Sequence, residues 1–208
     1  MTCIAIVLNH WTNGRLKPSH ITSVSLMGHI PVAWALITCR PILAAVLLAF
    51  FSALDALDGA LARVQKSSSL SGMYYDAVSD RLKEVLVFSA LAVYASKHLD
   101  QNISWLIVAV AGTSILVSYT KAKGEMAIAD KEKDTQKLNK IFSSGIASYE
   151  IRVATIVIGL LFGWLIYILP ILLILNIITI TTRFIKVSKE LKSIDSVELK
   201  KKSSKAND

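Results

Sequence analysis

Long apolar runs alternate with short polar or proline-containing breaks along the chain. The runs cover about residues 21–38, 41–54, 72–97, 103–119, 146–169 and 170–183. Their lengths bracket the roughly 20 residues that a helix needs to cross roughly 30 Å of hydrocarbon. This pattern predicts an all-α integral membrane protein, a bundle of six transmembrane helices.

Prolines mark several of the predicted helix ends. Ser19, next to Pro18, is expected to cap the first helix. Arg40-Pro41 is expected to end it and to begin the second helix, because proline is favoured at the first helical position. Leu169-Pro170 is expected to separate the fifth helix from the sixth.

Composition and charge agree with a membrane protein and orient it. Hydrophobic residues make up 53% of the 208 residues, mean hydropathy is +0.53, and the formal net charge is +8. The basic residues cluster at 121–140 and after residue 186, and basic segments beside membrane spans favour the cytoplasm. We therefore predict a multi-pass protein of the cell membrane with both termini cytoplasmic. A membrane domain would cover residues 1–185, and a mobile basic tail would cover residues 186–208. No nucleic-acid partner is expected, since the basic residues are not interleaved with aromatic ones.

Four carboxylates interrupt the apolar pattern. Asp55 and Asp58 are three residues apart, and Asp76 and Asp80 are four apart, so each pair shares one face of a helix. A helix that begins outside at Pro41 places the first pair about 21–26 Å further in, at the depth where the next helix begins. The two pairs can therefore meet toward the cytoplasmic side.

Carboxylates gathered in this way predict a metal site. Hard oxygen ligands select Mg²⁺, Mn²⁺ or Ca²⁺, Gly59 leaves room beside Asp58, and Arg63 could hold a phosphate. An ion or proton transporter that uses buried acids is the alternative from another class. It is disfavoured because the chain shows no internal repeat and its acids lie toward one face.

The acidic stretch resembles a known signature. Asp55-x-x-Asp58-Gly59-x-x-Ala62-Arg63, eight residues, then Gly72-x-x-x-Asp76-x-x-x-Asp80 is similar at every fixed position to the signature of the CDP-alcohol phosphatidyltransferases. The resemblance implies an enzyme of phospholipid biosynthesis. In that family an acceptor hydroxyl attacks the phosphorus joined to the lipid of a CDP-linked lipid, and CMP is released.

The resemblance also implies roles for particular residues. Asp55, Asp58, Asp76 and Asp80 would hold two Mg²⁺ or Mn²⁺ ions, and Asp80 would also be the catalytic base. Gly59, Arg63 and Ser69 would contact the CDP-linked lipid. Pro18-Ser19-His20-Ile21 is similar to the segment that borders the nucleotide, without the asparagine of the usual version. A homodimer in the bilayer is usual for the family.

Three further segments resemble the branch that accepts inositol phosphate: Arg81 after the last aspartate, Ser118–Glu125, and Glu150-Ile-Arg152. A phosphorylated polyol acceptor needs cations, for which Lys121, Lys123 and Arg152 are the candidates. Other roles stay open, since the lysines fit a positive-inside loop and Arg152 fits a residue that snorkels to the interface. Glycerol 3-phosphate is the alternative acceptor.

Overall fold

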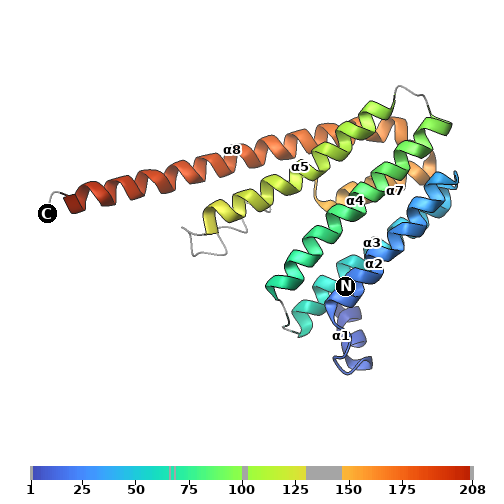
Figure 1. The fold of residues 1–208 in the computed structure, drawn as a ribbon, viewed down its shortest axis with the longest axis horizontal. Helices are drawn as coiled ribbons and strands as arrows, with labels where there is room; N and C mark the ends of the chain where they lie inside the picture. The colour runs from blue at the N-terminus through green and yellow to red at the C-terminus, as the bar shows by residue number, and fades with distance from the viewer. Residues whose placement is uncertain (1, 66, 68, 100–102, 130–146, 207–208) are drawn as a thin grey trace. The chain divides into compact units, whose positions relative to one another are not determined.

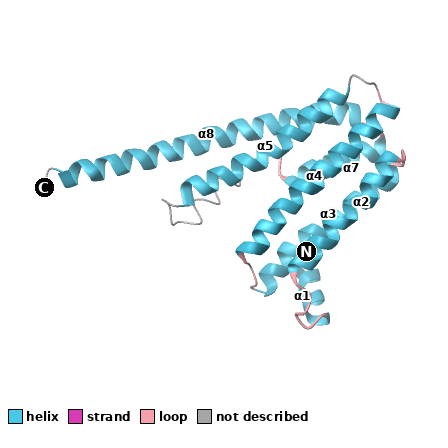
Figure 2. Cartoon of the chain, in the orientation of Figure 1, coloured by secondary structure: helices cyan, strands magenta, loops and turns pink. Residues whose placement is uncertain are grey.

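The computed structural model describes residues 2–65, 67, 69–99, 103–129 and 147–206, and these residues form helices joined by short loops (Figures 1 and 2). The described helices are α1 (Thr2–Trp11), α2 (Pro18–Ile37), α3 (Pro41–Gln65), α4 (Leu70–His98), α5 (Ser104–Ala129), α7 (Tyr149–Phe162) and α8 (Leu165–Ala206). The all-α prediction is confirmed for this part of the chain. The lysine-rich stretch of residues 130–146, the predicted start of the fifth span included, lies outside the described residues.

The chain divides into two compact units. The first comprises Met1–Ala111 and Tyr149–Pro170, and the second comprises Gly112–Ser148 and Ile171–Asp208. In the first unit α2 packs against α3 and α4, α3 packs against α7, and α1 packs against α3 (Figure 1). All four signature aspartates belong to this unit.

In the second unit, polar side chains join α5 to α8. The Asn176 side-chain amide donates to the hydroxyls of Thr113 and Ser114, both at 3.1 Å, and Arg183 donates to the carbonyl of Val117 at 2.6 Å. Hydrogen bonds between helices are a common means of association where the surroundings are apolar.

A close approach between α2 and α3 sets the position of the acid-bearing helix. The Ser25 hydroxyl donates to the Phe51 carbonyl at 3.0 Å. One turn along α2, a Cβ atom built on Gly28 would lie only 2.1 Å from the Phe51 ring. The absence of a side chain at Gly28 is therefore what lets the Phe51 ring pack against α2.

Several predicted helix ends are confirmed. The first predicted span is α2, which ends at Ile37, and the second is α3, which begins at Pro41, as Arg40-Pro41 suggested. The helix expected near Gly72 begins at Leu70, where the Ser69 side chain caps it by accepting a hydrogen bond from the Gly72 amide at 3.1 Å.

Other predicted ends were wrong. Ser19 is not a cap, because Pro18 already takes the first helical position and Lys17 precedes it as the N-cap residue. The break between the last two apolar runs falls at Gly163, whose φ of +69° ends α7, while Pro170 lies inside α8. The fourth run does not end near Tyr119, since α5 stays helical to Ala129.

Four of the described helices are long and apolar enough to cross a membrane: α2, α3, α5 and α8. The other two predicted spans correspond to α4 and α7. α4 has 29 residues but carries the charged side chains of the site, and α7 has 14 residues. The prediction of a multi-pass membrane protein is thus supported, and the count of six spans stays a prediction. α8 continues as a helix through the predicted tail to Ala206.

Gly28→Ala should destabilise the protein, because the new methyl group collides with an aromatic ring packed between two helices. Overpacking of this kind costs about 1–3 kcal/mol of unfolding free energy. Thermal unfolding in detergent would measure the loss. Gly112→Ala is the matched control, since nothing lies within 4 Å of a Cβ at that position. Equal melting temperatures for the two variants would contradict the proposed close approach.

Candidate active site

The structure brings the two predicted acid pairs together. α3 carries Asp55 and Asp58, the short connection after Gln65 reverses the chain, and α4 carries Asp76 and Asp80. One carboxylate oxygen from each of Asp55, Asp76 and Asp80 lies within 4.8 Å of the others. Three clustered carboxylates supply the hard oxygen ligands that divalent cations prefer, so these residues fit a Mg²⁺ or Mn²⁺ ion.

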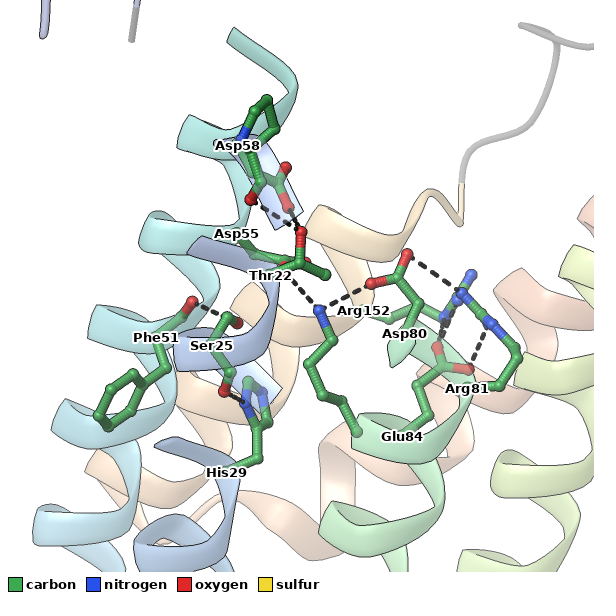
Figure 3. A network of polar contacts seen from close by, with 12 residues as sticks. Thr22, Ser25, His29, Phe51, Asp55, Asp58, Asp80, Arg81, Glu84 and Arg152 are labelled. Atoms are coloured by element: carbon green, nitrogen blue, oxygen red, sulfur yellow. Dashed lines mark hydrogen bonds and ion pairs between the residues drawn. The ribbon is translucent and has the colours of Figure 1, made fainter. Parts of the chain in front are cut away.

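Asp58 lies at the edge of this group and has its own partner. Its carboxylate accepts a hydrogen bond from the Thr22 hydroxyl of α2 at 2.5 Å, as Figure 3 shows. Asp58 is 7% exposed and Thr22 is 3% exposed, so the bond lies inside the first unit. Thr22 thus fixes one oxygen of Asp58 from the neighbouring helix, a contact that the spacing of the acids did not predict.

Lys83 is the principal residue that the sequence reasoning missed. Its side chain is fully buried, and its Nζ forms ion pairs with Asp55 on α3 and, at 2.8 Å, with Asp80 on α4. A signal existed in the sequence: Lys83 follows Asp80 by three residues and therefore shares its helix face. A charged residue inside an apolar helix is by default a candidate for function.

A second group of charges is centred on Glu84, one turn of α4 after Asp80. Glu84 accepts hydrogen bonds from Arg81 and from Arg152 of α7, the latter through Nε at 3.2 Å and also through Nη2 (Figure 3). Glu84 and Arg152 are 6% and 2% exposed. The predicted acceptor residue Arg152 is therefore an inward-facing partner of Glu84 in this structure.

Two cavities border the acids. The α7-side cavity, about 750 Å³, is lined by Asp55, Asp80, Arg63 and residues of α7 such as Tyr149. The loop-side cavity, about 950 Å³, lies among the beginning of α2, the end of α3 and the beginning of α4. Both cavities share three lining residues: Asp58, Gly59 and Asp76. Asp58 and Asp76 thus border both cavities, while Asp55 and Asp80 border the α7-side cavity.

The residues predicted for the CDP-linked lipid divide among these places. Pro18, Ser19, Gly59 and Ser69 line the loop-side cavity, and Gly59 and Arg63 line the α7-side cavity. His20 is exposed and lines neither cavity, and Ile21 is buried in an apolar cluster with Ala5 and Leu57.

The loop-side cavity also has polar walls that the sequence did not single out. Gln65 closes one side, donating to the Asn9 side chain and the Leu16 carbonyl, each at 2.9 Å. On α4 the Tyr75 hydroxyl lies 3.0 Å from that of Ser23. These contacts join α1 to α3 and α2 to α4 beside the loop-side cavity.

Lys121 and Lys123 belong to the second unit. Both lie in the helical end of α5, and Lys121 pairs with Glu125 at 3.8 Å on the surface. Their proposed contact with an acceptor stays a prediction.

Comparison with known proteins identifies the family. The sequence model of the CDP-alcohol phosphatidyltransferases matches residues 15–187. The chain belongs to this family. The family assignment confirms the resemblance carried by the acidic signature.

Several named proteins resemble the chain in sequence. It is 31% identical over 148 residues to a bifunctional IPC transferase and DIPP synthase of Rubrobacter xylanophilus, covering 71% of the chain and 32% of that protein. It is 33% identical over 115 residues to a phosphatidylinositol phosphate synthase of Corynebacterium glutamicum, covering 53% and 52%. An archaetidylinositol phosphate synthase of Pyrococcus horikoshii is 30% identical over 112 residues, covering 54% and 57%. The matches thus span about a third to just over half of these relatives' length.

Solved structures agree on the fold. A phosphatidylinositol phosphate synthase of Mycobacterium tuberculosis with CDP-DAG bound matches with a TM-score of 0.72 at 23% identity, covering 89% of this chain and 92% of that one. The same enzyme in complex with manganese and citrate matches with a TM-score of 0.71 at 23% identity, covering 89% and 88%. The chain therefore shares the fold of these structures.

Glu84→Ala should lower the free energy of unfolding by about 3–5 kcal/mol, because it leaves the Arg152 guanidinium buried without its carboxylate. Replacing both partners, by Glu84→Leu with Arg152→Met, should recover most of the loss, since no buried charge then remains at either position. Denaturant unfolding in detergent would compare the variants.

Glu125→Ala is the control, because the surface pair that it breaks contributes about 1 kcal/mol at most. If the double replacement were as unstable as Glu84→Ala, the buried pair would not be the source of the effect.

Proposed function

We propose that the protein transfers a phosphatidyl-type group from a CDP-linked lipid to a hydroxyl of inositol phosphate, releasing CMP. The acceptor oxygen forms a new bond to the phosphorus attached to the lipid. The bond from that phosphorus to the bridging oxygen of the pyrophosphate breaks, and CMP leaves with that oxygen. The proton of the attacking hydroxyl passes to Asp80.

The observation that carries the proposal is the position of the acids where two cavities meet: all four line the α7-side cavity, and Asp58 and Asp76 line both. Transfer between two substrates requires the donor phosphorus and the acceptor hydroxyl to meet at one point, and preorganised positioning supplies much of the rate. The loop-side cavity offers hydroxyl and amide groups to a nucleotide. In the α7-side cavity Arg63 would hold a phosphate of the CDP portion, and apolar residues such as Val153 and Val157 suit the lipid.

The proposal assigns each predicted residue a role. Asp55, Asp58, Asp76 and Asp80 would hold two Mg²⁺ or Mn²⁺ ions, which when bound neutralise the pyrophosphate and stabilise the departing CMP. Gly59, Arg63 and Ser69 bind the CDP portion, together with the Pro18–Ile21 segment. Within that segment, Pro18 and Ser19 are the residues that line the loop-side cavity.

The choice of inositol phosphate rests on the names of the relatives and on the second half of the chain. Synthases named for phosphatidylinositol phosphate and archaetidylinositol phosphate are among the similar proteins. Lys121 and Lys123 would supply positive charge for the acceptor phosphate. Arg152 is the third residue proposed to bind the acceptor, and in this structure it donates to Glu84 through Nε and Nη2.

The proposed arrangement in the membrane has six spans, with both termini and the active site on the cytoplasmic side. The distribution of positive charge supports this arrangement. Lysines are frequent in α8 from residue 186 onward, beyond its apolar part, and basic residues beside a membrane span favour the cytoplasmic side. The bilayer domain would cover residues 1–185, followed by a mobile basic tail over residues 186–208. A homodimer would be the assembled form, as is usual in the family.

Asp80→Asn should reduce CMP release from a CDP-linked lipid by roughly 10²–10⁴-fold, the usual contribution of a general base. Binding of the nucleotide portion should largely persist, because Asp80 does not line the loop-side cavity. Turnover and binding would be measured separately on purified protein with Mg²⁺.

Asp195→Asn, at an exposed position of α8, should leave both quantities unchanged. Turnover near the normal rate in Asp80→Asn would remove Asp80 as the base. Release that required neither a divalent metal nor an added alcohol would contradict the transferase function itself.

An acceptor panel would test the substrate. CMP release should be fastest with inositol phosphate, compared with glycerol 3-phosphate, serine and free inositol. Lys121→Ala should raise the KM for inositol phosphate roughly tenfold with a smaller change in kcat, since a charge-assisted hydrogen bond of ~1.5 kcal/mol corresponds to that factor. Lys189→Ala, which removes an exposed lysine of α8, is the control. A preference for glycerol 3-phosphate would replace the proposed acceptor.

A further inference from the structure

Lys83 is a cation attached to the helix that carries two of the proposed metal ligands. Its Nζ lies 2.8 Å from Asp80 and also pairs with Asp55 on the facing helix. Both of these acids belong to the three whose carboxylate oxygens lie within 4.8 Å of one another. The ammonium group therefore pairs with two of the carboxylates that a divalent ion would need.

The ion pair between Lys83 and Asp55 is buried, which strengthens the interaction between the two charges. The Lys83 side chain has no exposed surface, and Asp55 is 9% exposed. Water therefore screens these charges poorly, and each depends on its partner in the protein. Arg81 also pairs with Asp80, at 3.7 Å, but Lys83 pairs with both Asp55 and Asp80 and so balances an acid on each side of the gap between α3 and α4.

Two cations cannot both satisfy the same pair of carboxylates without repelling each other. An incoming divalent ion therefore competes with the Lys83 ammonium. A displaced ammonium group has space and an aromatic ring nearby. A small cavity of about 20 Å³ borders Lys83, Glu84 and Tyr149, enough for one water-sized group, and the Tyr149 ring centroid lies 5.9 Å from Nζ.

We propose that Lys83 is a tethered counter-ion, which holds Asp55 and Asp80 together in the metal-free protein and gives up its place when divalent metal binds. The inference rests on the metal site of the proposed function but not on its acceptor. A purely structural lysine predicts the opposite effect on metal affinity. If Lys83 supported the ligands in their metal-bound positions, its loss would weaken metal binding. If Lys83 competes for the ligands, its loss strengthens binding.

Lys83→Met tests the difference. The variant should bind Mn²⁺ at least about tenfold more tightly than the original protein, because metal no longer displaces a bound cation; tenfold is a modest effect for a buried unit charge at this range. In chelator its melting temperature should fall, because Asp55 and Asp80 then repel each other unbalanced. The increase in melting temperature on adding Mn²⁺ should therefore be larger than in the original protein.

Calorimetric Mn²⁺ titration and thermal unfolding, both on the full chain in detergent, supply the readouts without any measurement of turnover. Lys97→Met is the matched control, since Lys97 lies on the same helix but donates to the Ile37 carbonyl at the other end. Its affinity for Mn²⁺ should not change. Lys83→Gln, purified with Mn²⁺ present, repeats the test with a polar side chain should Lys83→Met fail to fold.

The outcomes separate the two proposals. Mn²⁺ affinity that is unchanged or weaker in both Lys83 variants would overturn the tethered counter-ion while leaving the metal site standing. If neither the original protein nor the variants bound Mn²⁺, the metal site would fail and the inference with it. If the variants bound Mn²⁺ more tightly but the original protein showed no transferase activity, the result would support the tethered counter-ion and contradict only the proposed function.

Discussion

The mutual repulsion of the carboxylates at the crossing of α3 and α4 is the constraint on which the first unit depends. Asp55, Asp76 and Asp80 converge at partly buried positions, so their negative charges repel one another unless a nearby cation balances them. In this structure Lys83 balances two of them. The neighbouring helices then make the convergence rigid, α2 through the bond from Thr22 to Asp58 and through the close contact at Gly28.

Charges along α4 follow a definite order. Asp76 and Asp80 line the cavities, and Lys83 comes one turn after Asp80. Next to Lys83, Glu84 accepts hydrogen bonds from Arg81 of the same helix and from Arg152 of α7. Beyond them the buried residues are apolar, among them Val87, Phe88 and Leu91. The lysine and the glutamate with its arginines thus form a neutralised layer between the acids and the apolar core. An enzyme in a bilayer needs such a layer, because unbalanced charge cannot extend into the core without a large desolvation cost.

The sequence predicted the acids and their meeting because helix spacing and a short connection fix both. It did not predict Lys83 as a partner, because its place inside the third apolar run does not show which acid of the facing helix it meets until α3 and α4 are packed. Arg152 shows the same limit, because only the packing of α7 reveals that Glu84 accepts its hydrogen bonds. The last break was misplaced for a local reason. Gly163 and Pro170 both disfavour helix, and a proline inside an apolar helix is tolerated when its surroundings compensate.

Lys83 and Arg152 are both buried cations near the same acids, yet their partners give them different roles. Arg152 forms two hydrogen bonds with Glu84, a residue outside the group of converging acids, and the planar guanidinium favours this fixed geometry. Lys83 presents a compact ammonium on a flexible stem to Asp55 and Asp80, which are inside that group. An arginine suits the fixed pair with Glu84, and a lysine suits a position that a metal ion takes over. The residue type at each position thus agrees with whether its partner is a proposed metal ligand.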